Sequence, residues 1–448
     1  MEQYKYIYFL GIGGIGMSAL ARYFNTLGKV VCGYDRTATD ITQQLQSQGV
    51  RITYNQEVEA LPLGLTPQNT LVVITPAIPK EHQQWRYFTE NDYTIIKRAE
   101  LLGIITKDTY CFAVAGTHGK TTTSSILAHI LYQSGVDVTA FVGGIVENYQ
   151  SNLIGNGTTV TVVEADEFDR SFMHLYPDMA CITSVDADHL DIYGDEAAIR
   201  KTFSDFAQKI PNTENLFTPT AVPIASTKVG FSPQDQVQIV DASIHDGVHH
   251  FSILYKTEKF DDFKFHLPGK HNLSNAVLAS AMALNYGVSV ANVRKALESF
   301  KGIKRRFSYK IKKDNLVLID DYAHHPTEID AVYQAVKELY PSKENMIVFQ
   351  PHLFSRTKDF FEGFVQSLSR FDKVWLLDIY PAREQPIEGV SSSGLLEALP
   401  NKDKRLVTKQ ELIDQIAGVS AKVIAMVGAG DIGELVTQVQ EKLSEKDE

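Results

Sequence analysis

A glycine-rich turn at residues 113–123 constrains the fold of this chain more than any other stretch. Ahead of it, the apolar run from Tyr110 to Ala115 predicts a buried strand, and after it apolar residues recur at helical spacing until Gly135. A turn of this kind points several backbone N–H groups at the positive end of the helix dipole, which is the geometry of a phosphate cradle. The stretch therefore predicts an α/β domain that binds a nucleotide.

The residues of the turn indicate how a nucleotide would be held. The strict P-loop pattern has a glycine where this chain has Val114, so the match is to a shorter variant, Gly-Thr-x-Gly-Lys-Thr. Lys120 would reach the β- and γ-phosphates, and the hydroxyl of Thr121 or Thr122 would hold Mg²⁺. The alternative is an ordinary βα turn whose glycines serve only the bend. The residues predicted to bind ATP here are Gly116, Thr117, His118, Gly119, Lys120, Thr121 and Thr122.

A second glycine loop follows the first predicted strand of the chain, residues 6–10. It is followed by a helical pattern over 17–27 and by a strand, 30–35, that ends in an acid. This βαβ unit resembles a dinucleotide fingerprint, but the loop recognises a pyrophosphate, which UDP-sugars also carry. Glycines needed only for packing are the alternative. The predicted substrate-binding residues are Gly11, Gly13, Gly14, Gly16 and Asp35, the last of them at a ribose hydroxyl.

Acidic residues end two further predicted strands, 158–165 and 179–185. The carboxyl ends of parallel strands line the crevice where such sheets bind ligands, and carboxylate oxygens suit Mg²⁺. Glu164 and His189, together with Thr121, are therefore the predicted metal ligands. The neighbouring acids fit a solvated loop equally well; they are Asp166, Glu167, Asp186 and Asp191.

The remaining chain predicts a second half of the central domain and a third domain. Residues 211–267 carry short alternating runs that indicate added antiparallel strands, and a helix entry follows at 268–276. Strand patterns then recur from residue 316 to 427, and the last runs into another glycine loop, 428–433. We expect an N-terminal Rossmann-like domain at 1–107, a central nucleotide-binding domain at 108–303 and a C-terminal Rossmann-like domain at 304–448.

Composition limits the class of protein. A net charge of −11 argues against a general nucleic-acid or membrane-surface binder, and no apolar run reaches the length of a membrane span. Cys32, Cys111 and Cys181 are far apart in apolar runs, which predicts buried free thiols in a reducing cytoplasm.

The order and spacing of these motifs resemble the Mur ligase family over the whole chain. The resembling segments are residues 11–17, 116–123, 164–167, 188–189, 271–275, 305–307, 320–328 and 351–357. The resemblance implies an ATP-dependent ligase with three α/β domains: a UDP-sugar-binding domain, a central P-loop ATPase and a C-terminal domain that closes over the site. We expect a monomer or weak homodimer. In the implied reaction, the lactyl carboxylate of UDP-N-acetylmuramate becomes an acyl phosphate, which the amine of L-alanine then attacks.

The resemblance also implies roles for single residues. The family pattern places Asn272, Asn275 and Asp321 near the nucleoside of ATP. His271 shares the helix entry with the two asparagines and is a further predicted ATP contact, with capping of the helix as the alternative. Arg306, one of three adjacent cations, is predicted at a phosphate. The residues near the amino acid are Tyr322, His324, His352 and Arg356, where Arg356 pairs with the carboxylate. The implied catalytic set is Lys120, Glu164, His189, His324 and Arg356. Members of the family often carry an arginine where this chain has Leu353.

Three other functions compete with this one. A murein-peptide ligase of the same family would add a tripeptide in place of L-alanine. A nicotinamide-dependent oxidoreductase would use the glycine loops at 11–16 and 428–433, but it leaves Lys120 and the strand-end acids unexplained. A nucleotide-switched binding protein would hydrolyse ATP without responding to a UDP-sugar.

Overall fold

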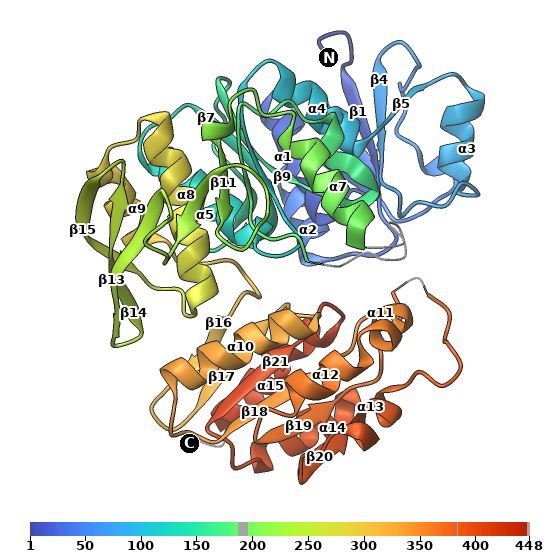
Figure 1. Ribbon diagram of the computed structural model, residues 1–448. Coiled ribbons are helices and arrows are strands. Elements are labelled where there is room, and N and C mark those ends of the chain that lie inside the picture. Colours follow the sequence, from blue (N-terminus) through green and yellow to red (C-terminus); the bar gives the residue numbers. More distant parts are fainter. Residues whose placement is uncertain (187–195, 383, 446–448) are drawn as a thin grey trace. The chain divides into compact units, whose positions relative to one another are not determined.

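The computed structural model describes residues 1–186, 196–382 and 384–445 (Figure 1). The chain divides into two compact units, which are described separately. The first comprises Met1–Ile244, His249–Phe265 and Ser274–Lys301, and the second His245–Val248, His266–Leu273 and Gly302–Glu448. His189 lies outside the described residues, so its predicted metal role has no structural counterpart to report.

The N-terminal sheet of the first unit is parallel throughout. Its order is β3 (Arg51–Thr53), β2 (Val30–Tyr34), β1 (Tyr6–Leu10), β4 (Thr70–Ile74) and β5 (Thr94–Lys97). The chain order reverses on either side of β1, so the loop after β1 opens into the crevice where a doubly wound sheet binds its ligand. The predicted Rossmann-like start of the chain is confirmed.

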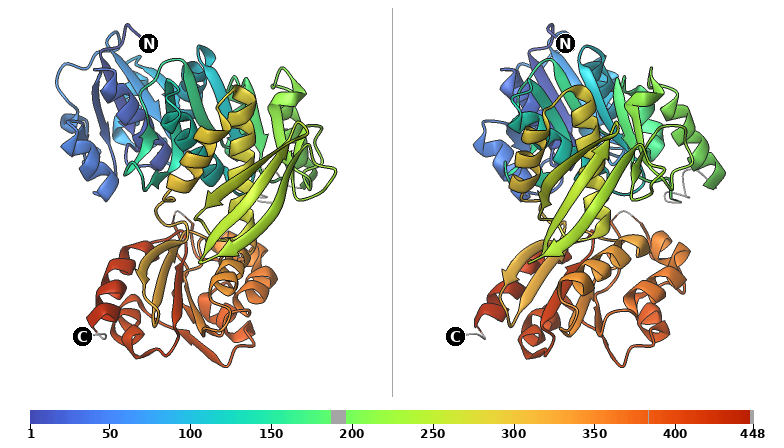
Figure 2. Two further views of the ribbon diagram at one scale, coloured as in Figure 1. Left: turned by 90° about the vertical axis from the view of Figure 1, so that its left-hand side faces the viewer. Right: turned by 60° about the vertical axis from the view of Figure 1, so that its left-hand side comes forward.

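A second sheet in the same unit carries the P-loop strand between two parallel neighbours. From one edge to the other, its order is β15 (Glu258–Phe265), β14 (Val248–Tyr255), β13 (Val237–His245), β12 (Thr227–Gly230), β11 (Leu216–Pro219), β10 (Met179–Ile182), β6 (Tyr110–Ala115), β9 (Val160–Ala165), β7 (Val138–Val146) and β8 (Ser151–Ile154). The antiparallel addition predicted over 211–267 is found in the pair β14–β15, part of the long ribbon in Figure 2. For β11, β12 and β13 of the same stretch the prediction is wrong, because they pair with one another in parallel. Both predicted acid-bearing strands, β9 and β10, flank β6.

One hydrophobic core joins these two sheets. Helix α1 (Ile15–Thr26) contacts β7 and β8, and its residue Phe24 lies in the same buried cluster as Phe141 of β7. Arg22 of α1 donates to Asn152 of β8 at 3.2 Å, and Asn152 in turn donates to the carbonyl of Ile15 at 2.6 Å. The glycine loop that precedes α1 is therefore fixed relative to the strands of the central sheet.

The second unit holds a sheet with apolar cores on both faces. Its order is β16 (Ser308–Lys312), β17 (Val317–Asp321), β21 (Val423–Val427), β18 (Asn345–Phe349), β19 (Lys373–Leu376) and β20 (Asp403–Leu406). Only β16 among these is antiparallel to its neighbour. Because β17 and β18 flank β21, the loops after these strands, at 322–328 and 350–357, meet at one edge of the sheet.

Helices complete the α/β architecture of both units. Those of the first unit, in addition to α1, are α2 (Asp40–Ser47), α3 (Gln83–Glu90), α4 (Arg98–Lys107), α5 (Lys120–Gln133), α7 (Glu196–Ala207) and α9 (Val290–Ser299). Helix α8 (Lys270–Tyr286) carries residues of both units. Those of the second are α10 (Pro326–Leu339), α11 (Phe354–Asp359), α12 (Phe361–Leu368), α13 (Ser392–Ala398), α14 (Lys409–Gln415) and α15 (Ile432–Glu445).

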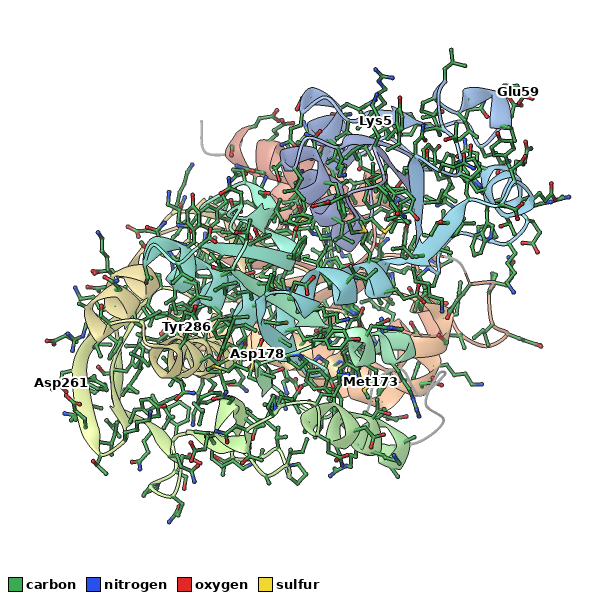
Figure 3. All side chains as sticks on the ribbon, turned by 90° about the horizontal axis from the view of Figure 1, so that it is seen from above. Lys5, Glu59, Met173, Asp178, Asp261 and Tyr286 are labelled. Atoms are coloured by element: carbon green, nitrogen blue, oxygen red, sulfur yellow. The ribbon has the colours of Figure 1, made fainter. Side chains whose placement is uncertain are left out.

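Charged residues lie at the surface of the protein, and the cysteines lie in its interior. Lys5, Glu59 and Asp261 lie at the periphery of the first unit in Figure 3, and all three are exposed. The cysteines are buried free thiols, as predicted. Within the described ranges, every helix is too short or too polar to cross a membrane.

A buried histidine in the first unit gives its stability a dependence on pH. His129 of α5 lies 2.7 Å from the Tyr149 hydroxyl and 3.0 Å from that of Ser299, and burial lowers its pKa to about 4. The unfolded chain therefore binds a proton between about pH 6.5 and the folded pKa, where the folded chain does not.

We expect the first unit to lose up to about 3 kcal/mol of unfolding free energy through this residue as the pH falls from about 6.5 to 4. Thermal unfolding midpoints across that range measure the loss. His129→Gln should flatten the profile, whereas His266→Gln, at an exposed position, should leave it unchanged. A profile of His129→Gln parallel to that of the unmodified protein would contradict the expectation.

Candidate active site

The glycine loop between β6 and α5 adopts the shape of a phosphate cradle. Gly116 and Gly119 have φ of 128° and 86°, which side-chain-bearing residues rarely adopt. A Cβ on Gly116 would also come within 2.1 Å of the Thr183 hydroxyl oxygen. The hydroxyl of Thr117 donates to the Asp186 carbonyl at 2.9 Å, which ties the loop to the chain after β10. The loop is thus bent by glycine and anchored on one side.

Lys120 opens helix α5 and lies against a carboxylate. Its Nζ is 2.9 and 2.8 Å from the two carboxylate oxygens of Glu167, and it also donates to the carbonyls of Gly116 and Thr117. Burial lowers the pKa of Lys120, but the carboxylates around it, Glu167 first, outweigh that effect and raise it. The loop therefore holds a fixed positive charge at the place where the phosphates of a nucleotide would lie.

Glu164 ends β9 beside the first turn of α5. Its carboxylate accepts hydrogen bonds from the Thr121 hydroxyl at 3.2 Å, the Ser124 hydroxyl at 3.0 Å and the Gly143 N–H. Burial raises the pKa of Glu164, and these donors and Lys120 oppose the rise. The structure thus brings together the two predicted metal ligands that it describes, Thr121 and Glu164.

This pair of oxygen donors suits a hard divalent cation. A hydroxyl and a carboxylate, with phosphate oxygens and water, make up the coordination that Mg²⁺ prefers. Among the described residues, no three His, Cys, Asp or Glu side chains gather where they could hold a metal ion. A cation here would therefore depend on the nucleotide for part of its coordination.

Helix α8 supplies an amide beside the cradle. A Cβ on Gly119 would come within 2.9 Å of the Asn275 Oδ1 atom, so this predicted nucleotide contact lies directly against the loop. Asn272, one turn earlier, donates its amide to the Pro268 carbonyl at 2.7 Å and so serves the helix entry. His271 lies beside Gly269, where a Cβ would come within 2.6 Å of its ring.

The loop after β1 is hydrogen-bonded to the carboxylate of Asp35. The Gly13 N–H donates to Asp35 Oδ2 at 2.7 Å, and the Arg36 N–H donates to Oδ1 at 2.7 Å. The Asp35 carboxylate thus shapes the loop, while its remaining lone pairs stay available to a hydroxyl. Gly11 has φ of 87°, and Gly14 precedes α1 without a side-chain cap.

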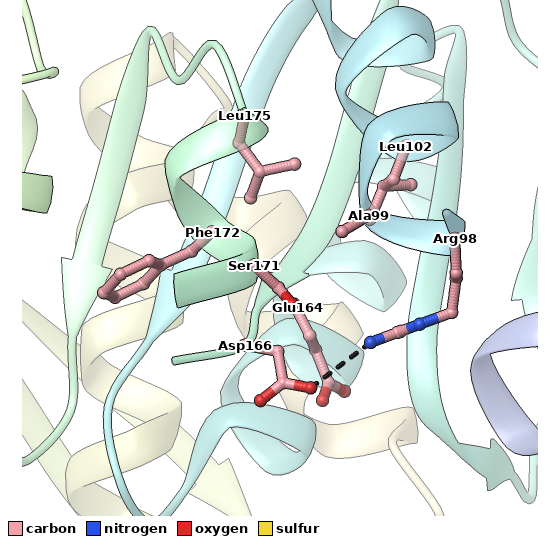
Figure 4. A pocket seen from close by; sticks show the side chains of 8 residues that line it. All are labelled: Arg98, Ala99, Leu102, Glu164, Asp166, Ser171, Phe172 and Leu175. Carbon is pink, nitrogen blue, oxygen red and sulfur yellow. Dashed lines mark hydrogen bonds and ion pairs between the residues drawn. The ribbon is translucent and has the colours of Figure 1, made fainter. Parts of the chain in front are cut away.

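A small pocket lies beside the acids at the end of β9 (Figure 4). Arg98, the first residue of α4, reaches into it with Nη2 3.3 Å from the Asp166 carboxylate. A Cβ on Gly16 would come within 2.5 Å of the other guanidinium nitrogen, Nη1. Its lining residues are Arg98, Ala99, Leu102, Glu164, Asp166, Ser171, Phe172 and Leu175.

The second unit gathers the four residues that the resemblance assigns to the amino acid. The His324 ring lies 5.4 Å from that of Tyr322 and 5.9 Å from that of His352, centroid to centroid. Burial lowers the pKa of His324, Glu328 opposes this, and the positive charge of Arg356 lowers it further. Leu353 holds φ of 71° at the start of α11, a strained value for a residue with a side chain.

Two more predicted nucleotide contacts lie beside this cluster. Asp321 is buried and accepts the N–H groups of Phe307 at 2.7 Å and Ala323 at 2.8 Å. Burial raises its pKa to about 6, against the charge of Arg306. The Arg306 guanidinium lies 5.8 Å from the Tyr322 ring centroid. Asp321 thus orders the turns on which Arg306 and Tyr322 stand.

Two residues of the site were not singled out by their sequence pattern. Glu167 fitted a solvated loop, yet it is buried against Lys120. Arg98 stands outside every motif, at the start of a helix that leads to the P-loop strand. Both residues lie far in sequence from their partners, so the sequence pattern does not reveal either contact. The one signal for Glu167 is its position three residues after Glu164, at the end of the same predicted strand.

The glycine loop with Lys120, set between a strand and a helix, defines a nucleotide-binding α/β protein. Three family models match in chain order: "Mur ligase family, catalytic domain" at residues 6–110, "Mur ligase middle domain" at 114–283 and "Mur ligase, glutamate ligase domain" at 305–433. The chain belongs to the Mur ligase family.

Particular relatives share almost the whole chain. It is 58% identical over 446 residues to the UDP-N-acetylmuramate–L-alanine ligase of Flavobacterium psychrophilum, with 100% of both chains covered. It is 42% identical to the enzyme of that name from Cytophaga hutchinsonii, covering 97% of this chain and 96% of the relative. The UDP-N-acetylmuramate–alanine ligase structure from Thermotoga maritima matches at a TM-score of 0.83 and 27% identity, over 98% of this chain and 99% of that one.

A murein peptide ligase structure from Psychrobacter arcticus shares the fold. It matches at a TM-score of 0.71 and 22% identity, over 98% of both chains.

Proposed function

We propose that this chain is an ATP-dependent ligase that joins L-alanine to the lactyl carboxylate of UDP-N-acetylmuramate, a step in peptidoglycan precursor synthesis. The observation that carries the proposal is the convergence of Lys120, Thr121 and Glu164 at the glycine loop, in a chain 58% identical to a relative of that name. The same relatives favour L-alanine over the tripeptide, and the P-loop argues against a nicotinamide oxidoreductase.

The phosphoryl-transfer step requires concentrated positive charge in the active site. The lactyl carboxylate attacks the γ-phosphate of ATP, and both reactants are anions, so catalysis depends on placement and electrostatics. In this proposal Lys120 contacts the phosphates, and the N–H groups at the start of α5 add partial positive charge. Mg²⁺, held by Thr121, Glu164 and His189, would neutralise charge on the phosphates. The amine of L-alanine then attacks the acyl phosphate and releases inorganic phosphate.

The outer parts of the chain take the two other substrates. Residues 1–107 bind the UDP-sugar through the loop at Gly11–Gly16 and Asp35, residues 108–303 bind ATP, and residues 304–448 bind the amino acid. In the last part, Arg356 pairs with the carboxylate of L-alanine near Tyr322, His324 and His352. Arg306 and Asp321 of the same part, with His271, Asn272 and Asn275, contact ATP. The enzyme works in the cytoplasm as a monomer or weak homodimer.

Phosphate release by the purified protein tests the function. Release should require UDP-N-acetylmuramate, L-alanine, ATP and Mg²⁺ together, and omission of any one should abolish it. Turnover with a tripeptide but not with L-alanine would favour the murein-peptide reaction. ATP hydrolysis indifferent to the UDP-sugar would favour a nucleotide switch, and tight saturable NADH binding would favour an oxidoreductase.

Arg356→Ala should raise the KM for L-alanine about 10- to 100-fold, because a charge-assisted pair with the carboxylate is lost. Steady-state kinetics with saturating ATP and UDP-sugar measure it. Lys358→Ala removes an exposed charge from the same helix, α11, and should change the KM little. An unchanged KM in the Arg356 variant would remove its carboxylate role.

A further inference from the structure

We propose that Arg98 recognises the lactyl carboxylate of the UDP-sugar, and so distinguishes this acid from UDP-sugars that lack it. The inference rests on the proposed function and names a binding residue for the same reaction. Its basis is the position of one guanidinium between the glycine loop after β1 and the acids at the end of β9.

The location of Arg98 fits the path that the acceptor must take. Its Nη1 lies over Gly16, in the first turn of α1, where the loop would hold a diphosphate. Its Nη2 faces Asp166, two residues after Glu164 and one before the partner of Lys120. A UDP-sugar whose diphosphate lies on the glycine loop must extend its acid toward the ATP site, and Arg98 stands between the two.

Charge makes Arg98 the suitable side chain in this pocket. Among the eight described residues that line it, Arg98 is the single base, and Glu164 and Asp166 would both repel a carboxylate. The Arg98 side chain is 30% exposed, so a ligand can still reach it. The planar guanidinium can donate two parallel hydrogen bonds to one carboxylate and a further one to a second, whereas a lysine ammonium binds as a point charge without this bidentate geometry.

The Asp166 carboxylate occupies the site on the Arg98 guanidinium that the lactyl carboxylate would take. Its carboxylate already contacts Nη2 at 3.3 Å, and Figure 4 shows the guanidinium directed at the acids rather than away from them. The cavity is about 10 Å³, room for roughly one water. Arg98 must therefore share its fork or leave Asp166 when the acid enters, so Asp166 competes with the ligand and does not help to bind it.

Calorimetric binding of two UDP-sugars to the whole protein, without ATP, tests this. UDP-N-acetylmuramate carries the lactyl carboxylate and UDP-N-acetylglucosamine does not, while both carry the diphosphate. Arg98→Gln should weaken binding of the first about 10- to 100-fold and leave the second unchanged. Arg98→Lys should fall between, because it keeps the charge and loses the fork.

A matched variant separates recognition from structure. Asp166→Asn breaks the same ion pair but removes a competing negative charge, so binding of UDP-N-acetylmuramate should hold or tighten. Arg86→Ala, at an exposed ion pair on α3, should bind both sugars as the unmodified protein does. Circular dichroism and unfolding midpoints confirm that each variant is folded.

The outcomes are distinct. Equal losses for both sugars in Arg98→Gln would assign Arg98 to the diphosphate and overturn the inference. Equal losses in Arg98→Gln and Asp166→Asn would make the pair structural and overturn it as well. Unchanged binding by Arg98→Gln would overturn only this inference, whereas an unmodified protein that does not bind UDP-N-acetylmuramate would overturn the proposed function with it.

Discussion

Lys120→Ala is expected to lower the turnover number about 10²- to 10³-fold, because it removes a phosphate-facing charge from a water-poor site. In the structure, the Lys120 ammonium contacts two loop carbonyls and both oxygens of Glu167, so its charge is already in place before a nucleotide binds. Phosphate release under saturating substrates measures the loss. A variant with near-normal turnover would reject the assignment of this loop to the phosphates.

The same substitution should also destabilise the first unit, since it leaves Glu167 buried without its cation. Breaking a buried pair in this way costs roughly 3–5 kcal/mol when the remaining group stays charged. Burial already raises the pKa of Glu167 and Lys120 opposes that rise, so the folded-state pKa would rise further without Lys120. The cost should therefore be small below about pH 4 and grow as the pH rises through the folded pKa.

A double variant separates the two effects of Lys120. Lys120→Ala/Glu167→Gln removes the unpaired charge, so it should recover most of the unfolding midpoint at pH 7 but none of the turnover. Recovery of both would mean that Lys120 acts through the fold and not through the phosphates. Loss of stability equal to that of the single variant would mean that the ion pair is not what stabilises the loop.

The backbone of the site follows from local sequence, which is why it was predictable. The apolar run at 110–115 forms β6 with those bounds, and the helix after the loop begins at Lys120. Glycine at positive φ is required at two points of the loop, and the chain places glycine at both. Local patterns determine strands and turns, because each depends on a few neighbouring residues.

The contacts between site residues depend on how helices and strands pack, and the sequence pattern carries no information on that packing. Glu167 points back to Lys120 because the chain bends after β9 into a 3₁₀ turn, Phe168–His174. Arg98 reaches Asp166 because α4 packs against that 3₁₀ turn, within the core that joins the two sheets of the first unit. The Asp35 carboxylate, which the sequence pattern predicts at a ribose hydroxyl, also accepts a hydrogen bond from the Gly13 N–H, a contact that the pattern does not predict.

Glu164→Gln should lower turnover about 100-fold or more and shift the Mg²⁺ requirement to higher concentration. The carboxylate lies beside the Thr121 hydroxyl, and an amide binds a divalent cation more weakly than a carboxylate does. Glutamine keeps the shape of the side chain, and its oxygen can still accept from Ser124 and Gly143, so the fold should be preserved. Phosphate release measured against Mg²⁺ concentration reports both changes.

Two comparisons give that result its meaning. Glu298→Gln removes an exposed carboxylate on α9, so it should leave turnover and the Mg²⁺ dependence unchanged. Thr121→Val removes the second oxygen donor while it keeps the volume of the side chain, so it should shift the Mg²⁺ dependence in the same direction as Glu164→Gln. If Glu164→Gln lost turnover but kept the original Mg²⁺ dependence, Glu164 would act on the loop and not on the cation. The hydroxyl–carboxylate pair would then be a hydrogen bond that orders the first turn of α5, and the cation would have to be held from elsewhere.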